Sequence, residues 1–201
     1  GYIVALLVGT VVVVTLQLPV ETIGTRFGGI PSGLPTFVLP QFTPEVVGGL
    51  PGEPRGELSM DLQVAHAIAP DARKVVVNAR PTVEGGGGYR KIGEMLEETD
   101  RQFPGAVWSF SIGWGCDKLI TAADLAPVRS ALRTAQSHGT TAYNASGDLA
   151  GMECRGGQDW SSPPSEQDVG LDSIASLPEM TSVGGTTLST DAQGVWQSEQ
   201  A

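Results

Sequence analysis

The pattern of apolar and polar positions divides the chain into an apolar start, a turn-rich middle and a regular remainder. In the regular part, stretches without helix breakers predict helices over residues 57–69, 89–103 and 121–138. Short apolar runs predict strands over residues 74–79, 106–112, 140–145 and 180–188, with Gly184-Gly185 interrupting the last. Helices that alternate with buried strands are typical of an α/β fold, so we expect a mainly parallel sheet with helices on both faces.

Residues 1–20 hold no charged side chain, and their apolar run fits two structures. Its length and lack of charge predict a transmembrane helix, whereas its Val-rich centre also suits a buried strand. We take the transmembrane helix as the expectation. Glycines and prolines then recur through residues 21–55, which predicts a linker that builds no core, with a boundary between two units near residues 45–55.

The overall charge argues against one class of partner. The net charge is −10 over 201 residues, so no basic surface is available for phosphate groups and we expect no nucleic-acid binding. The length suffices for one domain with a sizeable core. The two cysteines, Cys116 and Cys154, permit one disulfide, and neither belongs to a CxxC pattern. A disulfide that ties their two loops together is therefore a hypothesis.

Two acidic residues open the first predicted helix. Glu57 and Asp61 are four residues apart, so both carboxyl groups project from the same helix face. Adjacent carboxylates tend to keep a proton between them, which suits acid–base catalysis. The alternative is an exposed acidic first turn that interacts favourably with the helix dipole.

Two further segments follow the ends of predicted strands, where active residues gather in parallel sheets. In Ser146-Gly147-Asp148, a poorly solvated Asp148 would hold a proton and donate a hydrogen bond to a developing oxyanion. The alternative is a turn aspartate that caps the next segment. In Gly113-Trp114-Gly115, the glycines permit close approach of an extended peptide, or they form a tight turn with positive φ. For Trp114 the two alternatives are the wall of a pocket and a position in the core.

In this order and spacing, the residues resemble the sedolisin family of serine-carboxyl peptidases. The resemblance runs from about residue 51 to the end, through Gly56-Glu57-x-x-x-Asp61, Ser109–Gly115 (SFSIGWG), Ser146-Gly-Asp148 and Thr181–Thr187 (TSVGGTT). It implies a partial peptidase domain over residues 56–201 with a subtilisin-like fold, and a serine-type endopeptidase that acts on polypeptides in acid. By this resemblance Glu57 is the general base, Asp61 orients Glu57, Asp148 is the oxyanion-hole acid, and Gly113, Trp114 and Gly115 pair with substrate.

One part of the family pattern is missing. The family's nucleophile lies in a Ser-Gly-Thr-Ser motif downstream of the Val-Gly-Gly-Thr strand, and the 201 residues contain no such motif. We therefore expect a domain that is truncated before its nucleophile and inactive as this chain, or a non-catalytic peptide-binding remnant. The family's calcium site also lies downstream, so we expect no cofactor and no metal ligands in this chain.

Residues 1–45, and above all 18–35 (LPVETIGTRFGGIPSGLP), resemble a late membrane segment of sulfate permease-type anion transporters. There the segment follows a transmembrane helix, so a third hypothesis is a transporter fragment whose soluble part is incidental. A transport pathway needs several helices, which favours the peptidase interpretation. These expectations place the chain at a membrane, through residues 1–20, or in an extracytoplasmic or secreted setting.

Overall fold

The computed structural model describes residues 10–16, 45–47, 56–69, 71–79, 88–156 and 161–201. The helices are α2 (Gly56–Ile68), α3 (Gly88–Gln102) and α4 (Ala122–Ser137), with a short 3-10 helix, η1 (Asp117–Leu119). The strands are β1 (Thr10–Leu16), β2 (Glu45–Val47), β3 (Arg73–Ala79), β4 (Val107–Phe110), β5 (Thr141–Ala145), β6 (Thr181–Val183), β7 (Thr187–Thr190) and β8 (Trp196–Gln200). The three predicted helices begin and end close to their expected residues.

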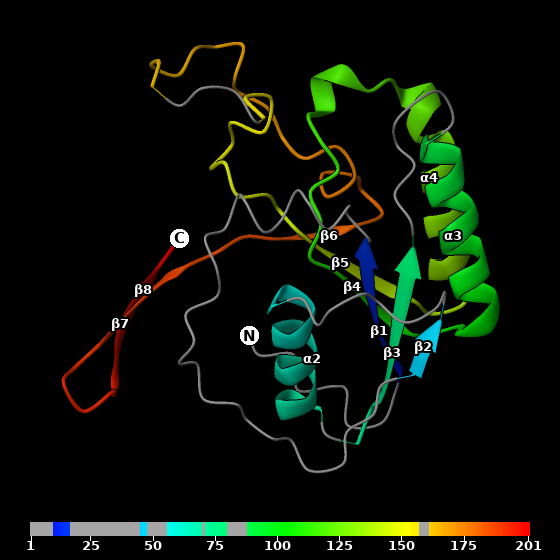
Figure 1. The fold of residues 1–201 in the computed structure, drawn as a ribbon, viewed down its shortest axis with the longest axis horizontal. Coiled ribbons are helices and arrows are strands. Elements are labelled where there is room, and N and C mark those ends of the chain that lie inside the picture. The colour runs from blue at the N-terminus through cyan, green and yellow to red at the C-terminus, as the bar shows by residue number, and fades with distance from the viewer. Residues whose placement is uncertain (1–9, 17–44, 48–55, 70, 80–87, 157–160) are drawn as a thin grey trace.

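A parallel sheet forms the centre of the fold. Its strands lie in the order β2-β3-β1-β4-β5-β6, and every neighbouring pair is parallel. Successive parallel strands need a crossover from one end of the sheet to the other, and α3 and α4 provide the crossovers from β3 to β4 and from β4 to β5. Figure 1 shows α3 and α4 together on one side of the strands and α2 on the other. The expected parallel sheet with helices on both faces is confirmed for the described residues.

The N-terminal apolar run forms a strand, so the predicted transmembrane helix is wrong for residues 10–16. β1 lies between β3 and β4, with Val12 opposite Val75 on one side and Trp108 on the other. A central parallel strand is buried on both faces and therefore has a continuous apolar sequence, as a membrane helix does. None of the described helices combines the length and the apolar character that a membrane span needs. Residues 1–9 and 17–20 lie outside the described part.

The Gly/Pro-rich segment also contributes to the sheet. β2 falls within the predicted linker of residues 21–55 and pairs with β3, with Val46 opposite Val76. Glycines and prolines mark turns but do not exclude a strand of 3 residues between them. β1 and β2 thus share one sheet with the strands after residue 56, and the predicted boundary does not separate them. The remainder of 21–55 lies outside the described residues, as does the transporter-like segment 18–35.

The main hydrophobic core includes side chains from the sheet and from the α3–α4 pair. Trp108 of β4, Leu96 of α3, and Val128 and Leu132 of α4 are each at most 1% exposed. Leu125, one helical turn before Val128, packs against the same cluster. The apolar side chains at this helical spacing therefore form the face of α4 that packs against the core.

The predicted strand over residues 180–188 divides at its glycines. β6 joins the sheet beside β5, and β7 leaves the sheet to form an antiparallel hairpin with β8. In Figure 1 this hairpin, in red, extends away from the sheet. Gly184-Gly185 therefore mark a change of direction between two strands.

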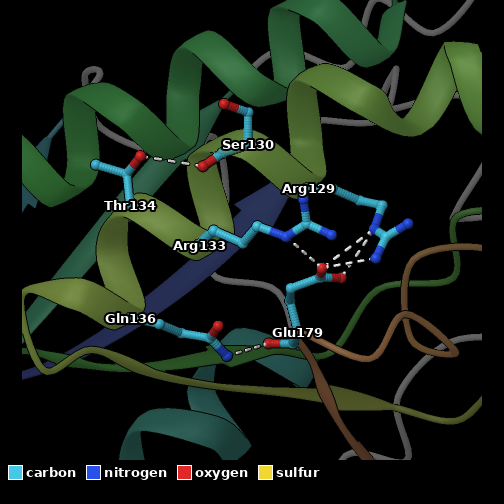
Figure 2. Close-up of polar contacts among 6 residues, drawn as sticks. All are labelled: Arg129, Ser130, Arg133, Thr134, Gln136 and Glu179. Carbon is cyan, nitrogen blue, oxygen red and sulfur yellow. Dashed lines mark hydrogen bonds and ion pairs between the residues drawn. The ribbon is translucent and has the colours of Figure 1, made fainter.

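A buried carboxylate, that of Glu179, anchors the chain segment just before β6. Glu179 is 7% exposed and pairs with Arg129 and Arg133 of α4, with Nη2–Oε1 and Nε–Oε1 distances of 2.8 Å (Figure 2). Its backbone carbonyl accepts a further hydrogen bond from Gln136. The bonds to its carboxylate, led by the one from Arg129, hold the pKa of Glu179 below its ordinary value. The segment before β6 is thereby tied to α4.

We predict that Glu179→Gln lowers the free energy of unfolding near neutral pH by about 2 kcal/mol, because an amide cannot pair with two guanidinium groups. The folded-state pKa of Glu179 is depressed, so its stabilisation is present above the unfolded pKa and is lost as the pH falls through the folded pKa. Urea unfolding of both proteins from about pH 7 down to about pH 3 measures this. The difference between them should shrink in acid, and a difference independent of pH would contradict the prediction.

Candidate active site

Two glycine-containing motifs lie at the carboxyl edge of the sheet. β4 and β5 are neighbouring parallel strands, so Gly113-Trp114-Gly115 after β4 and Ser146-Gly147-Asp148 after β5 leave the same edge. The N–H of Ser146 donates to the carbonyl of Val183 in β6 at 2.9 Å, which places the end of β6 beside them. The expected gathering of these motifs at one edge of the sheet is confirmed.

A buried amide joins two of these segments. Asn144 of β5 is 1% exposed, and its Oδ1 accepts a hydrogen bond from Trp114 Nε1 at 2.8 Å. Its Nδ2 donates to the carbonyls of Ile112 at 2.9 Å and Ala145 at 2.7 Å. The sequence interpretation missed Asn144 because it treated residues 140–145 as an apolar strand. An amide at an inward-facing position of that strand was the available signal, since buried amides need partners.

Several backbone groups of Gly113-Trp114-Gly115 are already bonded within the chain. The N–H groups of Trp114 and Gly115 donate to Asp172 Oδ2 at 2.5 and 3.2 Å, and the Gly115 carbonyl accepts from the Ser173 N–H at 2.8 Å. Gly115 has a φ of 99°, as the tight-turn interpretation predicts. Asp172 was not among the predicted site residues, although an aspartate before Ser-Ile-Ala suits a side-chain-to-backbone turn.

Trp114 lies where the core meets this edge. It is half-buried, and its ring meets that of Phe110 edge-on, with centroids 6.2 Å apart. The hydroxyl of Tyr89 in α3 donates to the Trp114 carbonyl at 3.4 Å. Burial is the main cause that raises the pKa of Tyr89, and the charge of Asp172 acts in the same direction, so the phenol stays a donor. Trp114 therefore packs against the core, as one of its two interpretations predicts.

The acidic pair lies on the predicted helix. Glu57 and Asp61 both belong to α2, so their spacing places them on one face. α2 packs against β1 and β3. Asp61 is half-buried, whereas the side chain of Glu57 lies outside the described part. The acid–base role of the pair and its exposed-turn alternative both stay predictions.

Asp148 is exposed, so the prediction that its carboxyl group is poorly solvated is wrong. Gly147 turns the chain with a φ of 110°, and a side chain there would collide with the carboxylate of Glu153. Glu153 Oε1 in turn accepts a hydrogen bond from the Leu149 N–H at 2.9 Å. Glu153 therefore fills the inner side of the turn, and Asp148 is left facing solvent. The strand pattern alone could not reveal this arrangement.

A disulfide joins the two site loops, as the sequence hypothesis proposes. Cys116 and Cys154 are bonded to each other across a sequence separation of 38. Within the described residues, these two cysteines and Asp117 form the one group of three potential metal ligands. Both sulfur atoms are committed to the disulfide, and a hard cation such as calcium requires several oxygen ligands. The group therefore does not fit a calcium site.

No protein-family model matches the chain, and no curated protein matches it in sequence. Among solved structures, the chain is similar to Pseudomonas sedolisin, a serine-carboxyl proteinase complexed with two molecules of pseudo-iodotyrostatin. The TM-score is 0.64 at 20% sequence identity, over 95% of this chain and 52% of the sedolisin chain. The chain thus spans about half the length of that protein, and the likeness shows a sedolisin-like fold.

We predict that replacing Cys116 and Cys154 by alanine lowers the free energy of unfolding by about 4 kcal/mol, because the long loop they close is released in the unfolded chain. Urea unfolding of the wild type and the double variant, each with and without reductant, measures this. Reductant should shift the wild type to the midpoint of the variant and leave the variant unchanged. Two titratable thiols in the denatured, unreduced wild type would contradict the disulfide.

Proposed function

We propose that this chain forms the peptide-binding part of a serine-carboxyl endopeptidase, a hydrolase of polypeptides that works in acid. The main support is the arrangement at the carboxyl edge of the sheet. There Gly113–Gly115 and Ser146–Asp148 lie side by side, joined through Asn144, on a sedolisin-like fold. Edges of this kind bind ligands in open α/β sheets.

The carboxyl groups have distinct roles in this proposal. Glu57 is the general base toward a serine, Asp61 orients Glu57, and Asp148 donates a hydrogen bond to the developing oxyanion. The half-burial of Asp61 supports a defined partner for the base. A carboxyl group donates only when it is protonated, and a carboxylate base accepts only when it is ionised. The two requirements are met together in acid, where one group of the set holds a proton.

Peptide pairing centres on Gly113. The N–H groups of Trp114 and Gly115 already donate to Asp172, whereas Gly113 is exposed. A Cβ added to Gly113 would lie 3.9 Å from Asp172 Oδ2, so the residue is not required by local packing. Its missing side chain instead leaves room for the backbone of an extended peptide.

Cleavage needs a nucleophile, and the 201 residues hold no Ser-Gly-Thr-Ser motif. We therefore propose that the 201-residue chain binds polypeptides without cleaving them. The second candidate is a module whose natural role is peptide binding alone. The exposure of Asp148 favours this candidate, because a solvated carboxyl is poorly suited to keep a proton for an oxyanion.

The disulfide supports an extracytoplasmic or secreted setting, since such bonds persist in oxidising compartments. Membrane association through residues 1–20 loses its main support, because residues 10–16 form a strand at the centre of the sheet.

The test is binding of rhodamine-labelled, carboxymethylated insulin B chain, an unfolded peptide, to the 201-residue chain at about pH 4. We predict a saturable rise in anisotropy and no new peptide fragments by mass spectrometry. Gly113→Val should raise the Kd at least about tenfold, because its branched side chain occupies the space of the peptide backbone.

The matched control is Ala126→Val, which adds branched methyl groups at an exposed position of α4 and should leave the Kd within about twofold. Absence of saturable binding by the wild type would overturn the proposed function. Fragments that disappear in Glu57→Ala would instead reveal a nucleophile within the 201 residues.

A further inference from the structure

The carboxylate of Asp172 accepts hydrogen bonds from four backbone N–H groups, which belong to two parts of the chain. The residue is 1% exposed. Its Oδ1 accepts from Ile174 at 3.2 Å and from Ala175 at 2.9 Å, which closes a local turn. Its Oδ2 accepts from Trp114 at 2.5 Å and from Gly115 at 3.2 Å, across 58 and 57 residues of sequence. One oxygen therefore shapes the local turn, and the other holds a distant segment.

Neighbouring bonds align the same two segments. The Ser173 N–H donates to the Gly115 carbonyl at 2.8 Å, and the Asp117 N–H donates to the Leu171 carbonyl at 2.9 Å. Asp117 Oδ1 accepts in return from the Leu171 N–H at 3.1 Å. Asp172 thus lies in the middle of a continuous set of contacts that holds the chain just after β4.

We propose that Asp172 is a positioning residue for the peptide-binding segment Gly113–Gly115, an inference that rests on the proposed function. Buried Asp172 accepts hydrogen bonds from the N–H groups of Trp114 and Gly115. These bonds fix the planes of the two peptide groups. Gly113 is then presented at the exposed edge in one orientation. The same bonds hold Trp114 where its indole N–H reaches Asn144, so both site segments keep one relative position.

The variant Asp172→Asn separates the two tasks of this carboxylate. Asparagine keeps one carbonyl oxygen, which suits the local turn with Ile174 and Ala175. Its NH2 group cannot accept a hydrogen bond, so the N–H groups of Trp114 and Gly115 lose their acceptor. The substitution therefore releases the distant segment and preserves the local one.

Two measurements on the 201-residue chain test this proposal. Amide hydrogen exchange should become at least about tenfold faster at Trp114 and Gly115 in Asp172→Asn and stay unchanged at Ile174 and Ala175. The Kd for the labelled insulin B chain should rise at least about tenfold. The matched control is Glu179→Gln, which alters another buried carboxylate of the same stretch but should leave the Kd within about twofold.

The outcomes separate the two proposals. No binding by the wild type overturns the proposed function and, with it, the positioning role. Binding by the wild type that Asp172→Asn retains, or that Glu179→Gln weakens equally, overturns the positioning role alone. If Asp172→Asn does not fold, Asp172→Ser replaces it. The serine hydroxyl can accept within the local turn but is too short to hold Trp114, so the same results are expected.

Discussion

The pairing of β1 between β3 and β4 is the constraint on which the rest of the structure depends. Through this pairing β1 sets the register of β3 and β4, and β4 in turn positions β5 and then β6. All these strands are parallel, so their carboxyl ends share one edge, and the glycine-containing site segments leave from that edge. α2, which carries the acidic pair, packs against β1 and β3. Without β1 the sheet would separate into two parts, and the site segments would lose their common support.

Two buried carboxylates extend this support beyond the sheet. Asp172 and Glu179 lie on the stretch of chain that leads into β6, and they tie it in different directions, one to the segment after β4 and the other to α4. Their physical roles differ. Asp172 accepts hydrogen bonds from the N–H groups of buried Ile174 and Ala175 and from the segment after β4. Glu179 offsets its desolvation by pairing with two guanidinium groups. The stretch of chain before β6 is thus held in place by the polar contacts of Asp172 and Glu179 as well as by apolar packing.

The sequence predicts the elements whose pattern is local and misses the features that depend on distant partners. Helical spacing is enough to locate α3 and α4, and a run of valines is enough to locate β3. β1 could not be told from a membrane helix, because both are continuous apolar runs. Asn144 and Asp172 gain their importance from partners 30 and 58 residues away. The exposure of Asp148 depends on Glu153 filling the inner side of its turn.

An enzyme that works in acid needs some carboxyl groups to exchange protons and others to keep their charge. Hydrogen bonds and ion pairs can separate the two sets. Arg129 holds the pKa of Glu179 below its ordinary value, and bonds from Ser165 do the same for Asp168. A group with a depressed folded pKa keeps its stabilising effect until the pH falls through that pKa. Glu179 and Asp168 therefore keep their hydrogen bonds and ion pairs to a lower pH than carboxyl groups with ordinary pKa values would.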